Sequence, residues 1–153
     1  MNSPFFYFGF GSNLNKSRLH MHCPSAQFLT IAELPHFRLA FTIRSENTWH
    51  GGVGDIQSSS DDSVWGALWL IDGEDSEELD KQEGVFRIPP AYQRKKVQVR
   101  TPADDLITCR TYQVVSPNLE GYSPSVAYKE TMLKGAKEIT LPGFYINFLE
   151  NIK

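Results

Sequence analysis

The sequence predicts a mixed α/β (α+β) protein, with helices on one side or end of a largely antiparallel sheet or barrel. Short segments rich in β-branched and aromatic residues recur through the first three quarters of the chain. Apolar residues near helical spacing follow them. At 153 residues the chain has the usual size of one compact domain, so we expect residues 1–153 to form a single domain.

Seven segments are expected to be strands, because they concentrate Val, Ile, Thr, Phe, Tyr and Trp. They are residues 5–10, 27–34, 37–43, 52–56, 64–71, 92–100 and 107–115. The intervening stretches 35–36, 58–62 and 102–105 have the Pro, Ser and Asp content of turns and exposed loops.

Helices are expected in four places. They cover residues 16–21, 76–83, 125–140 and 144–152. In the third, Val126, Met132 and Ala136 fall near helical spacing, and the Pro142-Gly143 pair separates it from the fourth.

Composition excludes several classes of protein. A hydrophobic content of 41% and a charged content of 22% are typical of a soluble globular protein. A net charge of −3 provides no basic surface for nucleic acid. The aromatic N-terminus lacks a basic flank and is interrupted by Gly9 and Gly11, so we expect no signal peptide and no membrane association, but a cytoplasmic protein. Cys23 and Cys109 are expected to be free thiols.

A glycine-flanked turn at residues 9–13 is the first candidate site. Glycines let a ligand approach the backbone, and successive N–H groups at a helix start form an anion-binding concavity. Such a turn suits a carboxylate or a developing oxyanion. Spacing alone favours a plain turn over a ligand site, and Leu14 leaves the dinucleotide fingerprint incomplete.

Glu83, at the end of the second predicted helix, is the second candidate. Leu79 precedes it by four residues, so both side chains share one helix face, and Gly84 supplies the helix stop. Burial on that face would raise the carboxyl pKa from about 4.3 toward about 6–7, where it can take and return a proton. A surface ion pair with a lysine is the alternative interpretation.

Other polar clusters are weaker candidates for a functional site. His20, His22 and Cys23 could ligate zinc, but no second cluster completes four ligands, so no metal site is expected. His50 has no accompanying nucleophile, and we expect a turn there whose Trp49 packs in the core. Trp65 and Trp69, four apart in a strand, are expected in the core.

Four motifs in order resemble those of the γ-glutamyl cyclotransferase family. They are Tyr-Phe-Gly-Phe-Gly-Ser-Asn-Leu at 7–14, Trp-His-Gly-Gly at 49–52, Trp-Gly-x-x-Trp at 65–69 and Leu-Asp-x-Gln-Glu-Gly-Val at 79–85. The similarity continues through residues 108–112, 123–129 and 135–138, and so covers nearly the whole chain.

This resemblance implies a small mixed barrel, γ-glutamyl cyclotransferase-like, with the active cavity inside it. The implied partner is a small γ-glutamyl peptide. The implied reaction converts γ-glutamyl amino acids to 5-oxoproline and the free amino acid without a cofactor, within glutathione metabolism. The resemblance also suggests a homodimer. The alternatives are a related enzyme acting on glutathione or γ-glutamyl-ε-lysine, and a non-catalytic binding protein with the same fold.

The resemblance also assigns roles to residues. Glu83 corresponds to the catalytic acid/base, and the substrate-binding residues correspond to Tyr7, Phe8, Gly9, Phe10, Gly11, Ser12, Tyr92 and Tyr128. Backbone donors of residues 9–12 are expected to meet the substrate carboxylate or carbonyl oxygen. Phe10 stands where the family has Tyr, and the segment 85–91 is longer than its counterpart. We therefore expect substrate preference, rather than chemistry, to differ.

Overall fold

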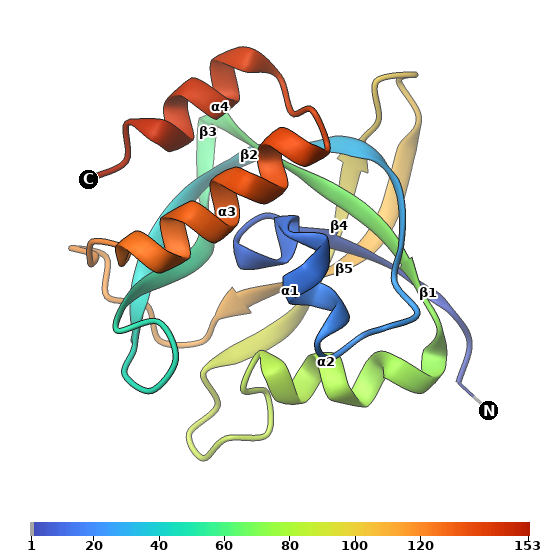
Figure 1. The fold of residues 1–153 in the computed structure, drawn as a ribbon. Helices are drawn as coiled ribbons and strands as arrows, with labels where there is room; N and C mark the ends of the chain where they lie inside the picture. Colours follow the sequence, from blue (N-terminus) through green and yellow to red (C-terminus); the bar gives the residue numbers. More distant parts are fainter. Residues whose placement is uncertain (1) are drawn as a thin grey trace.

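A closed barrel of five strands organises the computed structural model, which describes residues 2–153 (Figure 1). The strands are β1 (Phe5–Gly9), β2 (Gln27–Ser45), β3 (Gly51–Ile71), β4 (Tyr92–Arg100) and β5 (Leu106–Val114). Around the barrel their order is β1-β3-β2-β4-β5. All neighbours are antiparallel except β1 and β5, which are parallel and close the barrel. The mixed barrel with flanking helices is therefore confirmed.

Two predicted turns are wrong, because β2 and β3 are long and continuous. β2 passes through Pro35 and His36, and β3 passes through residues 58–62. The register changes here: Pro35 pairs with Ser63, whereas Phe37 pairs with Ser58. Extra residues of β3 thus oppose one residue of β2, and a bulge of this kind accommodates a proline and a polar stretch without ending the ladder.

The four predicted helices are present, with ends that differ by one or two residues. They are α1 (Lys16–His20), α2 (Ser76–Gln82), α3 (Val126–Glu138) and α4 (Gly143–Glu150), with short 3-10 helices η1 (Ser12–Leu14) and η2 (Gly73–Asp75). Asn15 and Ser125 cap α1 and α3, each accepting a backbone N–H with its side-chain oxygen. Figure 1 shows α3 and α4 together on one side of the barrel and α2 near its opposite end.

The helices cover one of two apolar clusters. In the larger cluster Trp69, Leu19 and Met132 are fully buried, so the barrel wall packs against α1 and α3. The other cluster, built on Phe8 and Ile56, is formed by barrel strands. Trp65 is only partly buried and packs edge-on against Phe144. None of the helices within residues 2–153 is long and apolar enough to cross a membrane.

Candidate active site

One cavity of about 140 Å³ brings together residues that are distant in the chain. Its walls come from the turn after β1, from α1, from the β2–β3 connection, and from the end of α2 with the loop that follows. Most of the predicted site residues line it. These are Tyr7, Phe10, Gly11, Ser12, Glu83, Tyr92 and Tyr128.

Glu83 is the C-cap of α2 and faces this cavity. Leu79, one turn earlier, is fully buried, and Gly84 takes a φ of 71° that ends the helix, as the spacing predicts. Burial raises the pKa of Glu83 to about 7, although the charge of Arg18 and hydrogen bonding from Tyr7 lower it. A carboxyl with this pKa exchanges protons at neutral pH.

Asn13 joins the turn to Glu83. Its Nδ2 donates to the Tyr7 hydroxyl at 3.0 Å and lies 3.5 Å from Oε1 of Glu83. Its Oδ1 accepts from Gln82 Nε2 at 3.2 Å, and its backbone oxygen accepts from the Trp69 indole at 3.2 Å. The sequence places Asn13 in the turn but does not indicate this contact, because the partners come from distant segments.

The Tyr128 hydroxyl projects from α3 to the turn. It accepts the backbone N–H of Ser12 at 3.2 Å and that of Gly54 at 2.9 Å. Both lone pairs are then occupied, and the hydroxyl proton is left to donate. Burial raises the Tyr128 pKa to about 12, despite those two N–H donors, so the proton is retained at neutral pH. A Cβ on Gly11 would lie 2.3 Å from this hydroxyl, so only glycine fits there.

This arrangement corrects one expectation about the turn. The Ser12 N–H, expected to meet the substrate, is donated to Tyr128 instead. The Tyr128 hydroxyl of α3, whose oxygen accepts the Ser12 and Gly54 N–H groups, retains its proton as a donor beside the turn.

Tyr92 has the opposite polarity. Its hydroxyl donates to the Gly54 carbonyl at 2.5 Å, which leaves only acceptor capacity for a ligand. Gly54 thus positions both tyrosines, one through its N–H and one through its C=O.

Phe8 and Gly9 do not line the cavity. Phe8 is fully buried in the strand cluster, where its ring is 6.3 Å from that of Phe10. Gly9 pairs with Ala67, and a Cβ there would lie 2.7 Å from the Asn13 carbonyl oxygen. Both residues shape the turn rather than face the space it encloses.

Trp49 and Arg18 form a wall that the sequence does not reveal. Trp49, expected in the core, is partly buried and lines the cavity, edge-on to Tyr128 at 5.1 Å. The Arg18 guanidinium lies 5.0 Å from the Trp49 ring centroid. His50 is exposed and outside the lining.

His20 and Cys23, two of the residues considered as zinc ligands, each contact a backbone carbonyl oxygen. Within residues 2–153 no group of three His, Cys, Asp or Glu side chains is placed to hold a metal ion. A ring nitrogen of His20 instead contacts the Ala26 carbonyl at 2.9 Å. Cys23 is buried with its Sγ 3.8 Å from the Asp75 carbonyl oxygen, and both Cys23 and Cys109 are free thiols.

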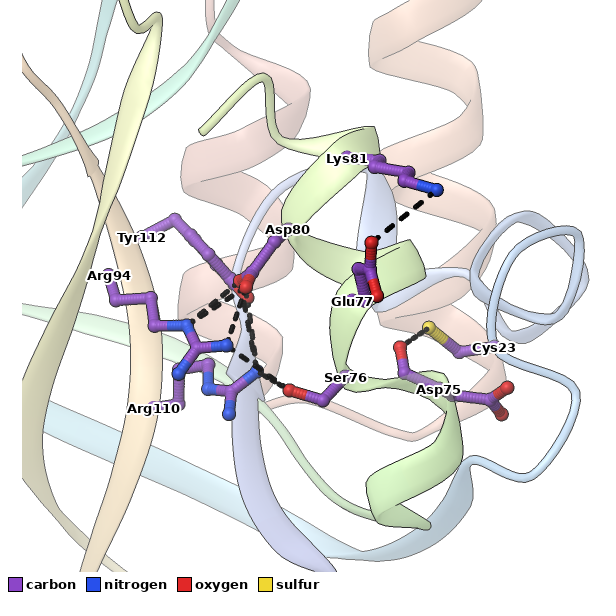
Figure 2. A network of polar contacts seen from close by, with 9 residues as sticks. All are labelled: Cys23, Asp75, Ser76, Glu77, Asp80, Lys81, Arg94, Arg110 and Tyr112. Carbon is purple, nitrogen blue, oxygen red and sulfur yellow. Dashed lines mark hydrogen bonds and ion pairs between the residues drawn. The ribbon is translucent and has the colours of Figure 1, made fainter. Parts of the chain in front are cut away.

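Asp80 anchors α2, the helix that carries Glu83 (Figure 2). Its carboxylate accepts from Arg94 Nε at 2.9 Å and from the Tyr112 hydroxyl at 2.6 Å, and Arg110 lies 3.8 Å away. Burial alone would raise the Asp80 pKa, but the hydrogen bonds from Arg94 and Tyr112 outweigh it and hold this pKa below its usual value. Because these partners belong to β4 and β5, the network fixes α2 to the barrel.

Fold and cavity together define a class of small α+β barrel proteins in which one carboxyl of raised pKa faces tyrosine hydroxyls. A profile of the AIG2-like family matches residues 63–149. The γ-glutamylcyclotransferase of Bos taurus is 41% identical over an alignment of 152 positions, which covers 97% of this chain and 79% of the bovine protein. The Homo sapiens γ-glutamylcyclotransferase is 40% identical with the same coverage.

A solved structure titled γ-glutamyl cyclotransferase superposes with a TM-score of 0.93. It is 38% identical and matches 99% of this chain and 89% of its own. The chain belongs to the γ-glutamylcyclotransferase family, within the AIG2-like proteins. The resemblance of the four motifs is therefore confirmed.

Proposed function

We propose that this protein is a γ-glutamylcyclotransferase that converts γ-glutamyl amino acids into 5-oxoproline and the free amino acid. The observation that carries the proposal is the Glu83 carboxyl, whose pKa is about 7, inside a tyrosine-lined cavity of a close structural relative of such enzymes. The reaction is an intramolecular acyl transfer and needs no cofactor.

Ring closure begins with proton transfer. The substrate α-ammonium gives a proton to ionised Glu83, and the neutral amine attacks the γ-carbonyl carbon of the same molecule. Because the nucleophile is tethered, a well-aligned attack can correspond to an effective molarity of about 10⁵–10⁸ M. The cavity residues therefore need to align the amine with the carbonyl and to transfer protons, since the two reacting groups already belong to one molecule.

Collapse of the tetrahedral intermediate returns the proton. The bond between the γ-carbon and the second amino acid's nitrogen breaks as Glu83 donates its proton to that leaving nitrogen, and the ring nitrogen passes its remaining extra proton to the released amine, which leaves as an ammonium. One carboxyl serves both steps, which a pKa near the working pH favours.

Tyr128 is the proposed donor to the carbonyl oxygen. Its hydroxyl accepts two backbone N–H groups and keeps its proton, so the O–H is oriented for a developing oxyanion. Tyr92, as an acceptor, suits the substrate's ammonium or amide N–H. Tyr7 and Asn13 hold Glu83, and Phe10, Gly11 and Ser12 form the adjoining wall. Phe8 and Gly9 do not face the substrate in this proposal; they fix the conformation of the turn.

A substrate panel tests the proposal. We expect purified protein to release 5-oxoproline from γ-glutamyl-alanine faster than from glutathione or γ-glutamyl-ε-lysine. Release from glutathione alone would favour the glutathione-specific reaction, and release from the lysine isopeptide alone the second alternative. Binding without release from any of the three would favour a non-catalytic protein.

The proposal extends to a cytoplasmic setting in glutathione metabolism and to a homodimer, which the family resemblance supports. It also treats residues 1–153 as one domain, because β1 near one end pairs with β3 and β5 to close the barrel. Light scattering of the purified protein measures the number of subunits. A monomer at micromolar concentration would contradict the dimer.

A further inference from the structure

The cavity carries a local charge opposite to that of the chain. Three arginines line it, Arg18, Arg44 and Arg87, whereas Glu83 is the one acidic residue in its lining within residues 2–153. The chain as a whole has a net charge of −3. With Glu83 ionised, the lining therefore carries two more positive than negative charges, in a concave site that strengthens the local field.

Arg87 extends this charge to the catalytic end of the cavity. A Cβ on Gly84 would lie 3.2 Å from both Cδ and Nε of Arg87, so this side chain lies over Gly84, the residue after Glu83. Arg87 is exposed and forms no salt bridge with any other residue in the range 2–153. Its guanidinium is thus free to bind an anion.

Arg18 offers a second donor. Its Nε is buried and has no hydrogen-bond acceptor among residues 2–153. A buried N–H without an acceptor is costly, and a ligand oxygen would supply one. Arg44 contributes less, because its Nε is 3.0 Å from Glu46 and both side chains are well exposed.

We propose that this cavity selects γ-glutamyl peptides whose second amino acid has an acidic side chain, with Arg87 as the main specificity-determining residue. This inference rests on the proposed function. The second amino acid leaves as an amine that takes its proton from Glu83, so its nitrogen lies next to Glu83, and Arg87 lies over the adjacent Gly84 within reach of that amino acid's side chain. A γ-glutamyl dipeptide with a neutral second residue has a net charge of −1, whereas an acidic one has −2 and supplies a further carboxylate to the unpaired Arg87 guanidinium.

The test compares γ-glutamyl-glutamate with γ-glutamyl-glutamine, which have nearly the same shape and differ by one charge. We expect kcat/KM to be about threefold to fivefold higher for the glutamate dipeptide at low salt. The ratio should fall toward one as ionic strength rises. In Arg87→Gln the ratio should approach one at low salt as well. Arg38→Gln, on the exposed part of β2 outside the lining, should keep the wild-type ratio.

Binding to Glu83→Gln separates selectivity from chemistry. Calorimetry on this variant should give a lower Kd for the glutamate dipeptide by the same factor, and equal Kd values would overturn the inference. Turnover of both dipeptides at equal kcat/KM would also overturn it while leaving the proposed function intact. Turnover of neither would instead overturn the proposed function, and the Kd ratio would then decide the selectivity.

Discussion

Nδ2 of Asn13 lies 3.5 Å from Oε1 of Glu83, although 70 positions separate these residues in the chain. The same nitrogen donates to the Tyr7 hydroxyl. The glycine-flanked turn and the carboxyl at the end of α2, which look like two independent features in the sequence, therefore form one polar unit.

Asn13→Ala tests this unit. Losing the amide frees the Glu83 carboxyl to move, and a misplacement of about 1 Å can lower the rate by up to about 100-fold. We expect kcat to fall at least tenfold with a smaller change in KM, because the Asn13 amide contacts Glu83, Tyr7 and Gln82 and so positions the proposed acid/base. Asn147→Ala, exposed on α4, is the matched control. A purely structural role would change melting temperature without this split between kcat and KM.

The pH dependence of kcat/KM should reveal the Glu83 pKa. As a base Glu83 must be ionised, so activity should fall below pH 7 as the carboxyl becomes protonated. Hydrogen bonding from Tyr7 lowers this pKa, so Tyr7→Phe should move the acid limb to higher pH. A limb at the ordinary glutamate pKa of about 4.3 would contradict the burial of Glu83.

Stability should depend on the same group. The folded-state pKa of Glu83 lies above its unfolded value, so folding is favoured by the protonated form, and this contribution is lost as pH rises through about 7. Glu83→Gln cannot ionise. From pH 5 to pH 8 the free energy of unfolding of the variant should therefore gain about 2 kcal/mol relative to wild type. Urea unfolding at both pH values measures this, and a constant difference would contradict it.

Tyr128→Phe and Tyr92→Phe should differ. Removing the Tyr128 hydroxyl deletes the proposed oxyanion donor, worth about 3 kcal/mol, so kcat should fall about 100-fold. It also leaves the Ser12 and Gly54 N–H groups without an acceptor. Tyr92→Phe removes the acceptor that faces a ligand, together with the hydrogen bond to the Gly54 carbonyl but no oxyanion donor, so KM should rise more than kcat falls. Steady-state kinetics of both variants measures this difference. Equal effects on kcat would contradict the assignment of Tyr128 as a hydrogen-bond donor and Tyr92 as an acceptor toward the substrate.

The strand pattern predicts the barrel segments well but not their continuity. Pro35 and the polar residues 58–62 look like turns locally, whereas β2 and β3 pass through them. Composition cannot distinguish a bulge from a loop, because the pairing partner that sustains the ladder lies elsewhere in the chain. The parallel contact of Tyr7 with Arg110, which closes the barrel, is likewise non-local.

The candidate site, like the barrel, can be predicted only in part from the sequence. Leu79, Glu83 and Gly84 share one helix end, so spacing alone allows two interpretations, a carboxyl facing inward and a surface ion pair. Arg18 over Trp49 has no such local signature. Contacts of this kind depend on how the turn, α1 and the β2–β3 connection meet in space, and no periodic pattern encodes them.

Release of 5-oxoproline by Glu83→Gln tests the central claim most directly. The amide is nearly isosteric with the carboxyl but cannot accept the α-ammonium proton, so we expect a folded protein whose turnover of γ-glutamyl-alanine is at least about 100-fold lower than wild type. Retained binding of the dipeptide, measured by calorimetry, would show that the cavity is intact. Turnover equal to wild type would contradict the role of Glu83.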